Sequence, residues 1–359
     1  MVLSFAAMLG VLHIIDSDAP AEMLDQLALA ASPADRLVSA GPCPDRPLPW
    51  PVEELHRPLS AATLCGWRNG GFPGQEKAVH AWSIPAAQVA GAIADQRGCG
   101  AVLSLPHVPA PADLARLAKL VRGGELMLTV PTESCRLCLL KALDCPATIH
   151  VLPPCARVTG DAAARRKQAR ASLGLAEHEQ LVVAPAGITW QAGHCYACWI
   201  HAVLRQIKSN LRLLLPGVGP CVAEVRRFAD ATGHGEEILM PEEQLAIPDA
   251  LAAADLAVFF FSREGGLSNL AAAMAAGLPI VAWADDDVSE ILGDAGRLTP
   301  CGDVRSASAA VLEMLEAPAL RASLAASAER RAAGALSVDQ CRHKLAEIHQ
   351  AARRPGCIA

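Results

Sequence analysis

Short apolar runs alternate with longer, mixed segments along the whole chain. Continuous apolar stretches of this kind are typical of parallel strands that are covered on both faces. We therefore predict strands at residues 11–15, 101–105, 126–130, 148–152, 181–184, 211–215, 256–261 and 280–283. Amphipathic segments between them predict helices, among them residues 113–121, 198–207, 222–231 and 247–253. Strands that alternate with helices in this way predict doubly wound, parallel α/β domains.

The chain is too long for one ordinary hydrophobic core, since it has 359 residues. The strand that ends in Pro153-Pro154 precedes a new α/β run, so we place the boundary between a first domain at 1–155 and a second at 156–359. Residues 41–75 are rich in Pro and Gly and predict a long irregular insertion. The tail is helical with a break at Pro318, and its last helix is expected to pack back on the first domain.

Composition limits the classes of function. A hydrophobic content of 52% with 19% charged residues indicates a globular protein, and a net charge of −6 argues against a nucleic-acid-binding surface. The apolar N-terminus lacks a basic region and a cleavage site, and polar residues interrupt every long apolar run. No strongly basic amphipathic helix supports membrane contact. The 13 cysteines, an odd number, fit a reducing compartment, so we expect a cytoplasmic protein.

The most informative stretch is residues 255–303, which predicts a strand, a polar turn, an Ala-rich helix and a second strand. The helix is expected to end at Gly277, which accepts a left-handed C-cap, and Pro279 prevents its continuation. The turn between the first strand and the helix carries Glu264. Free N–H groups and the helix dipole make such a corner attractive to phosphate groups.

Three segments of the second half together resemble glycosyltransferase family 4. They are LRLLLPGVGPCVAEVRRFADATG, EEILMPEEQLAIPDALAAADLAVFFFS and REGGLSNLAAAMAAGLPIVAWADDDVSEILGDAGRLTPCGD. In the first half, VLHIIDSDAPAEMLDQLA, AVHAWS, AVLSLPHVP and LMLTVPTES follow the order of that family's N-terminal domain. The resemblance implies the GT-B architecture, in which two Rossmann-like domains of doubly wound parallel sheets face each other across a cleft.

The resemblance further implies retaining transfer of a sugar from a nucleotide-sugar donor to an acceptor that is a glycan, a lipid or a small molecule. No cofactor or metal is expected, because helix N–H groups and positive side chains stabilise the leaving diphosphate. The implied catalytic residues are Glu264, His107 and His80. The implied donor-binding residues are Gly265, Gly266, Ser268, Asn269, Leu270, Met240, Pro241 and Arg263.

The chain departs from the family pattern at three polar positions. Ala272 stands where the second Glu of the Glu-x7-Glu signature would bind the ribose hydroxyls, and Ile188 and Ala192 stand where an Arg and a Lys would clamp the diphosphate. These losses keep two alternatives open: an inactive GT-B protein that binds a partner or acts as a scaffold, and an enzyme with an unusual donor. His194 and Arg263 are the nearby candidates for a partial replacement of the cations.

Two Cys-x-x-Cys pairs, Cys135/Cys138 and Cys195/Cys198, raise the possibility of a zinc site, since His194 and His201 flank the second pair. Both pairs fall in apolar, helix-like segments, where residues three apart share one face. They also belong to different predicted domains. We therefore expect buried thiols rather than a metal site.

Overall fold

The computed structural model of the chain describes residues 11–15, 21–30, 35–39, 52–54, 76, 78–123, 126–157, 162–241, 245–261 and 266–352. The chain forms two compact units, of which the first joins Met1–Pro153 to Val338–Ala359 and the second is Pro154–Ser337. The predicted boundary at residue 155 lies beside this division. Residues from Val338 onward, placed in the second domain from sequence, lie in the first unit, as the expected return of the last helix would require.

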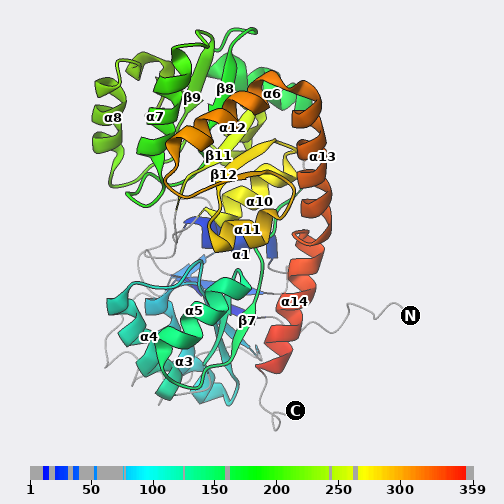
Figure 1. Cartoon of the computed structure of the whole chain (residues 1–359). Coiled ribbons are helices and arrows are strands. Elements are labelled where there is room, and N and C mark those ends of the chain that lie inside the picture. Colours follow the sequence, from blue (N-terminus) through cyan, green and yellow to red (C-terminus); the bar gives the residue numbers. More distant parts are fainter. Residues whose placement is uncertain are drawn as a thin grey trace. The chain divides into compact units, whose positions relative to one another are not determined.

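The first unit contains a parallel sheet with seven strands among the described residues (Figure 1). Their spatial order is β3-β2-β1-β4-β5-β6-β7. The strands are β1 (Leu12–Ile15), β2 (Arg36–Ser39), β3 (Val52–Glu54), β4 (Val79–Ala81), β5 (Ala101–Ser104), β6 (Leu126–Val130) and β7 (Ile149–Val151). The described helices are α1 (Ala21–Ala30), α3 (Ile84–Arg97), α4 (Pro111–Gly123), α5 (Glu133–Leu143) and α14 (Val338–Ala351).

The two faces of this sheet have different cores. One face packs aliphatic side chains such as Leu12, Ile14 and Leu103 against α3, α4 and α5. The opposite face carries polar side chains, because the register aligns His13 of β1 with His80 of β4, and Ser104 of β5 with Thr129 of β6. Helix α14 contributes His349 to this face, and its Ile348 packs with Val102.

The buried polar face is a connected hydrogen-bond network. His80 bonds His349 through Nδ1 and Nε2 at 2.9 Å, and bonds the Ser104 hydroxyl through its own Nε2 at 2.8 Å. Ser104 in turn bonds Thr129 at 2.6 Å. The His80 ring also stacks on Trp82, with 4.3 Å between ring centroids. Because buried polar groups must be paired, this network specifies where α14 docks on its own unit.

The second unit contains a parallel sheet with six strands among the described residues, in the order β10-β9-β8-β11-β12-β13. The strands are β8 (Gln180–Val183), β9 (Leu211–Leu214), β10 (Ile238–Leu239), β11 (Leu256–Phe259), β12 (Ile280–Trp283) and β13 (Arg297–Thr299). The described helices are α6 (Ala162–Ser172), α7 (His194–Arg205), α8 (Val222–Ala231), α9 (Ile247–Ala253), α10 (Leu267–Ala275), α11 (Asp286–Leu292), α12 (Val304–Glu316) and α13 (Pro318–Gly334), with a short 3-10 turn at Gly235–Glu237.

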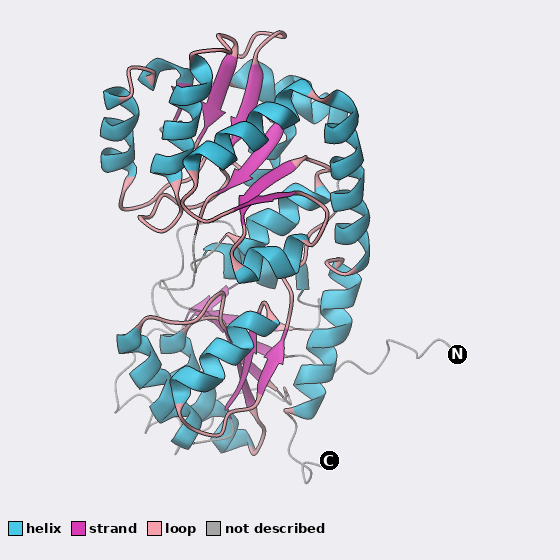
Figure 2. Ribbon diagram, viewed as in Figure 1, coloured by secondary structure: helices cyan, strands magenta, loops and turns pink. Residues whose placement is uncertain are grey.

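Helices cover both faces of the second sheet (Figure 2). Helices α6, α9, α10, α11 and α13 pack on the face that carries Val183, Phe259 and Ile280. Helices α7, α8 and α12 pack on the face that carries Val182 and Val258. This arrangement explains why the strands read as continuous apolar runs, and it confirms the predicted α/β fold class.

The eight strands predicted from apolar runs are all present, whereas β2, β3, β4, β10 and β13 are absent from the prediction. Length alone does not explain this, because most of the predicted strands are equally short, but β3, β4 and β13 contain a Glu, a His or an Arg and form no continuous apolar run. The predicted C-cap at Gly277 is confirmed. Gly277 has a φ of 65°, and its N–H and that of Leu278 bond the carbonyls of Met274 and Ala273.

We predict that Gly100→Ala destabilises the first unit. The Gly100 N–H donates to the Ala352 carbonyl at 2.8 Å, and a Cβ at Gly100 would collide with that carbonyl. Displacing the end of α14 is expected to lower the free energy of unfolding by about 1–3 kcal/mol, measured by urea denaturation.

Gly91→Ala is the matched control. Gly91 lies within α3, and a Cβ there meets nothing within 4 Å. This change is expected to raise stability by about 0.5–1 kcal/mol, since Ala is the better helix former. Equal effects of the two substitutions would contradict the proposed docking of α14.

Candidate functional site

The candidate site lies at the carboxyl edge of the second sheet. Chain connections run outward in opposite directions from the two central strands, since β8 leads through α7 to β9 and β11 leads through α10 to β12. Parallel α/β sheets bind ligands where such a reversal opens a crevice between two loops. Here the described parts of the two loops are residues 184–193 after β8 and Phe260, Phe261 and Gly266 after β11.

Glycines let the loops of this edge approach one another at backbone distance. Gly193 ends the loop after β8 with a φ of 73°, and a Cβ there would collide with the Phe260 carbonyl. Gly217 and Gly219, in the loop after β9, face the carbonyls of Ala186 and Ile188 in the same way. Its packing against the loop after β8 gives this Gly-x-Gly a structural role.

Helices α7 and α10 both begin at this edge with a glycine at the N-cap position, Gly193 and Gly266. A glycine offers no side-chain acceptor for the first N–H groups of a helix. By contrast, Ser83, Thr132, Asp285 and Asp303 cap α3, α5, α11 and α12 through their side-chain oxygens. Helix starts without such an acceptor suit a negatively charged ligand.

The structure places part of the predicted donor-binding set at the start of α10. Gly266 has a φ of 86°, and a Cβ there would meet the Phe261 ring at 2.8 Å. Ser268 and Asn269 are partly exposed in the first turn, whereas Leu270 is fully buried. Arg263, Glu264 and Gly265 lie outside the described residues, so their roles stay predictions.

The remaining predicted residues lie elsewhere. Met240 and Pro241 directly follow β10 at the same edge of the second sheet and are partly exposed. His107 follows β5 of the first unit, where its Nδ1 lies 3.1 Å from the Val108 carbonyl. His80 is fully buried within β4, and burial together with the neighbouring His349 and His13 holds the pKa of its imidazole well below the usual value. The catalytic roles of both histidines stay predictions.

Two of the three positions that depart from the family pattern, Ile188 and Ala272, lie in or against the core, whereas Ala192 is partly exposed. Ile188 is 1% exposed and packs in the core that covers one face of the sheet. Ala272 packs against the core on the other face. Neither residue offers a polar group to a ligand.

His194 does not restore the missing positive charge. It is the first residue of α7 and is buried, with the carbonyls of Ala184 and Ala186 close to its ring. Burial lowers the pKa of this imidazole to about 4, so the ring is neutral at physiological pH. The imidazole of His194 therefore supplies no positive charge to an anion at this edge.

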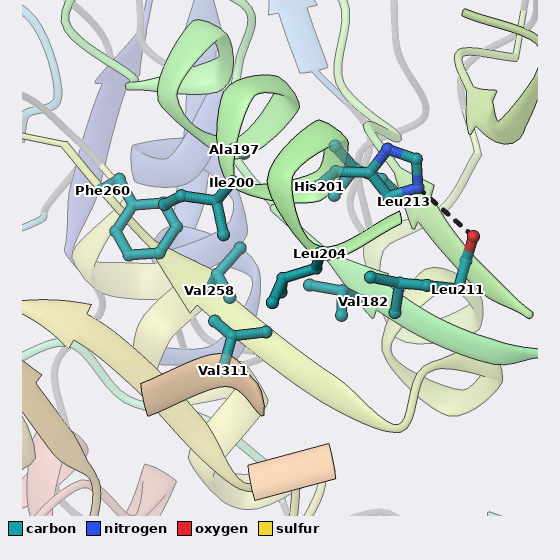
Figure 3. Close-up of a pocket in the computed structure, with 10 residues that line it drawn as sticks. All are labelled: Val182, Ala197, Ile200, His201, Leu204, Leu211, Leu213, Val258, Phe260 and Val311. Atoms are coloured by element: carbon teal, nitrogen blue, oxygen red, sulfur yellow. Dashed lines mark hydrogen bonds between the residues drawn. The ribbon is translucent and has the colours of Figure 1, made fainter. Parts of the chain in front are cut away.

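A narrow cavity lies beneath α7, away from the carboxyl edge (Figure 3). Aliphatic and aromatic side chains line it, together with His201, whose Nε2–H donates to the Leu211 carbonyl at 3.3 Å. Burial lowers the pKa of His201 to about 4. The cavity is apolar and too narrow for a nucleotide, so it belongs to the core.

The Cys-x-x-Cys pairs lie on helices α5 and α7. Burial raises the pKa of Cys198 to about 12, which keeps this thiol protonated and a poor metal ligand. Within the described residues, no group of three or more His, Cys, Asp or Glu side chains is arranged to hold a metal ion. None of the helices in the described part of the chain has both the length and the apolar character needed to cross a membrane.

Three exposed aromatic side chains near this edge were not singled out from the sequence. Trp190 lies in the loop after β8, and Tyr196 and Trp199 lie on α7. Their rarity was the available signal, since the chain has 4% aromatic residues and one tyrosine. Helical periodicity did not separate them from core residues, because their neighbours on α7 are apolar as well.

Comparison with known proteins agrees with this geometry. Residues 181–317 match the family model described as "Glycosyl transferases group 1". The matched range includes β8, α7, β11 and α10, which form both sides of the candidate site. The match confirms the resemblance to glycosyltransferases read from the sequence. No curated protein sequence matches the chain.

Solved structures share the fold of nearly the whole chain. HepE from Anabaena, crystallised with UDP-glucose, is 16% identical, with a TM-score of 0.80 over 95% of this chain and 99% of its own. Sucrose-phosphate synthase from Thermosynechococcus elongatus is also 16% identical, with a TM-score of 0.75 over 95% of this chain and 98% of its own. A Rickettsia africae glycosyltransferase is 10% identical, with a TM-score of 0.73 over 97% and 99%. The chain therefore has a GT-B fold.

We predict that Gly193→Ala disrupts the candidate site. An alanine must adopt a positive φ and also displace the Phe260 carbonyl, so the loop after β8 shifts. Gly174→Ala is the matched control, because Gly174 also has a positive φ but a Cβ there meets nothing within 4 Å. Thermal unfolding is expected to show the larger loss for Gly193→Ala, by about 1–3 kcal/mol. Equal losses would show that the close approach is unimportant.

We also predict acid sensitivity that depends on His201. Its pKa is about 4 in the folded chain and near 6.5 when unfolded, so the unfolded state binds the proton more readily. The contribution of neutral His201 to the free energy of unfolding is therefore fully present above about pH 6.5. It falls by up to about 3 kcal/mol as the pH drops towards 4. In urea unfolding, His201→Gln should flatten this pH dependence. The exposed His178→Gln should leave it unchanged, and an unchanged slope in His201→Gln would contradict the assignment.

Proposed function

We propose that this chain is a glycosyltransferase that uses a nucleoside diphosphate sugar as donor. The observation that carries the proposal is the match of residues 181–317 to the glycosyl transferases group 1 model, because that range holds both loops of the candidate site. The fold of HepE, whose crystal structure contains UDP-glucose, supports the same donor class. UDP is accordingly the first nucleotide to test.

In this proposal the donor diphosphate lies between the starts of α7 and α10. Helix N–H groups stabilise its charge, and Gly266 lets the backbone approach the sugar. Met240 and Pro241 contact the base, and Ser268 and Asn269 open the helix that faces the phosphates. Glu264 binds hydroxyl groups of the donor sugar, with Arg263 and Gly265 beside it.

The transfer is proposed to retain the anomeric configuration, without a metal. Positive groups and N–H donors stabilise the leaving diphosphate in such a reaction. His107 and His80 are the polar candidates of the first unit, and the buried network around His80 gives that residue a positioning role. A cytoplasmic setting is proposed from the sequence, since 13 cysteines, an odd number, fit a reducing compartment.

A second candidate function is a GT-B protein that binds a nucleotide or partner without turnover. The observation that favours it is the burial of Ile188 in the core, since a cation belongs at this position in the family. The neutral His194 supplies no replacement. Electrostatic stabilisation of a leaving group is often the largest catalytic contribution, so its loss affects turnover more than binding.

Calorimetric titration with UDP, GDP, ADP, CDP and dTDP tests the donor site. We expect one of these, UDP first, to bind with a Kd of about micromolar order. The absence of binding to any of them, by folded protein, would contradict a donor site. Release of UDP from UDP-glucose in the presence of sugar acceptors then separates an enzyme from a binding module.

Restoring the missing carboxylate gives a directional test. Ala272→Glu places a carboxylate where the family binds ribose hydroxyls, and we expect it to tighten UDP binding about tenfold, the equivalent of about 1.4 kcal/mol. Ala276→Glu, an exposed position at the end of α10, is the matched control and should leave affinity unchanged. Equal effects would show that α10 does not face the ribose.

A further inference from the structure

The outward face of α7 is apolar and aromatic. The structure describes every residue of α7. The most exposed side chains of this helix are Tyr196, Trp199 and Val203, with exposed fractions of 44%, 53% and 45%. They recur three and four residues apart and therefore line one side of the helix. The polar His194 and His201 are buried on the opposite side. Because Ala197, Cys198, Ile200 and Leu204 on the buried side pack in the core, α7 is apolar on both sides, and its exposed apolar side is available to a partner.

The two exposed rings are held in place by other rings. Tyr196 packs edge-on against Trp283 with 4.7 Å between centroids, and Trp283 is itself buried at the end of β12. Trp199 lies 6.2 Å from Phe228 of α8. Rings fixed in this way lose little conformational freedom when a ligand stacks on them. Tyr196, Trp199 and Val203 are together called the α7 aromatic face.

The charges around this face are balanced. Arg205, the cation of α7, bonds Glu237 at 2.6 Å. Lys208, just after the helix, lies 3.5 Å from Glu316, and Arg227 of the neighbouring α8 lies 3.4 Å from Glu224. An anionic lipid surface is recognised through an excess of cations, which the described residues here do not provide. The face therefore fits an uncharged partner.

The area of the face is small for a dimer. A fully buried aromatic side chain contributes about 150–250 Å², and these rings are roughly half exposed. The face thus offers a few hundred Å², whereas a stable complex buries about 800 Å² on each partner. A second copy of the chain would need a further contact surface, so a smaller ligand fits better.

We propose that the α7 aromatic face binds a neutral oligosaccharide. The C–H faces of pyranose rings are apolar and stack on aromatic rings, while the tyrosine hydroxyl and indole N–H can bond sugar hydroxyls. Tyr196 lies in the first turn of α7, at the carboxyl edge that holds the candidate donor site, and Trp190 is 70% exposed in the loop just before it. The face therefore extends from the donor edge along α7.

This inference rests on the proposed function for its choice of ligand, because a glycosyltransferase must hold a sugar acceptor. It adds a subsite for an extended acceptor chain, with Tyr196 and Trp199 as positioning residues. A carbohydrate of this class is uncharged, like the face.

Affinity gel electrophoresis with dextran, hydroxyethyl cellulose or galactomannan in the gel tests the inference. The native chain should be retarded by at least one of these polymers. The double variant Tyr196→Ala/Trp199→Ala should bind it at least about tenfold more weakly, and Trp199→Phe should keep most of the retardation. Leu137→Ala, which removes an exposed apolar side chain from α5 of the first unit, is the matched control and should behave like the native chain.

Several results would overturn the inference. Retardation by none of the three polymers, or equal retardation of the double variant, would exclude this glycan site. A native dimer that the double variant converts to monomer in sedimentation would assign the face to a second copy. Co-sedimentation with phosphatidylcholine vesicles that the variant loses would assign it to a bilayer.

UDP calorimetry on the same variants separates the two proposals. If the double variant binds UDP like the native chain but is no longer retarded by the polymer, both the donor site and the glycan face are supported. Retardation of the native chain without any nucleotide binding would reject the donor site while keeping the glycan face. Folded variants are identified by their circular dichroism, so a failure to fold is not mistaken for a lost contact.

Discussion

Close approach of backbone to backbone at the carboxyl edge of the second sheet is the constraint on which the candidate site depends. Gly193, Gly217 and Gly219 each face a carbonyl group of a neighbouring loop at a distance that a Cβ would not permit. The approach fixes the loop after β8 against the loops after β9 and β11. Because α7 starts directly at Gly193, the same contacts set the position of its first N–H groups and of Tyr196. Binding groups are thus held by packing of the backbone rather than by side-chain hydrogen bonds.

Three residues near this edge supply no charge. Ile188 lies in the core, Ala272 packs on the core, and burial keeps His194 neutral. What remains for a diphosphate among the described residues is the dipole and N–H groups of two helices that begin with glycine. Such a site binds an anion more weakly than one with an Arg and a Lys. The aromatic side chains around α7 offer a different source of affinity, one that depends on stacking and is little affected by salt.

In the first unit, a buried network of hydrogen bonds between polar side chains constrains the packing of the helices. His13, His80, Ser104 and Thr129 lie on one face of the sheet, and His349 completes their network from α14. The Trp82 indole donates to His13 Nδ1 at 3.0 Å, so a neutral His13 carries its proton on Nε2, 3.3 Å from Asp35. A buried network of this kind tolerates few arrangements, since each unpaired group would be destabilising. It accounts for the return of the last helix to the first unit.

The sequence by itself determined the order and type of the main elements. Each of the eight apolar runs predicted as a strand forms a strand, and α10 ends before Gly277, as the conformational freedom of glycine predicts. Ala272, Ile188 and Ala192 could likewise be identified from the sequence as departures from the pattern that the family resemblance implies, since a motif is a local property of the chain. Strands such as β3, β4 and β13 were not predicted, because a Glu, a His or an Arg within them leaves no continuous apolar run to separate them from a loop.

Only the tertiary structure decided which side chains are buried and which faces stay open. His80 and His349 are 269 positions apart, so no local pattern reveals that they bond each other. Similarly, α7 is apolar on both sides, and its sequence gives no sign of which side meets the sheet. Packing between α8 and α12 settled this by burying His201 and leaving Trp199 exposed. The burial of a side chain, and the pKa shift that follows from it, depend on many residues that are far apart in the sequence. Those residues meet only in the folded chain.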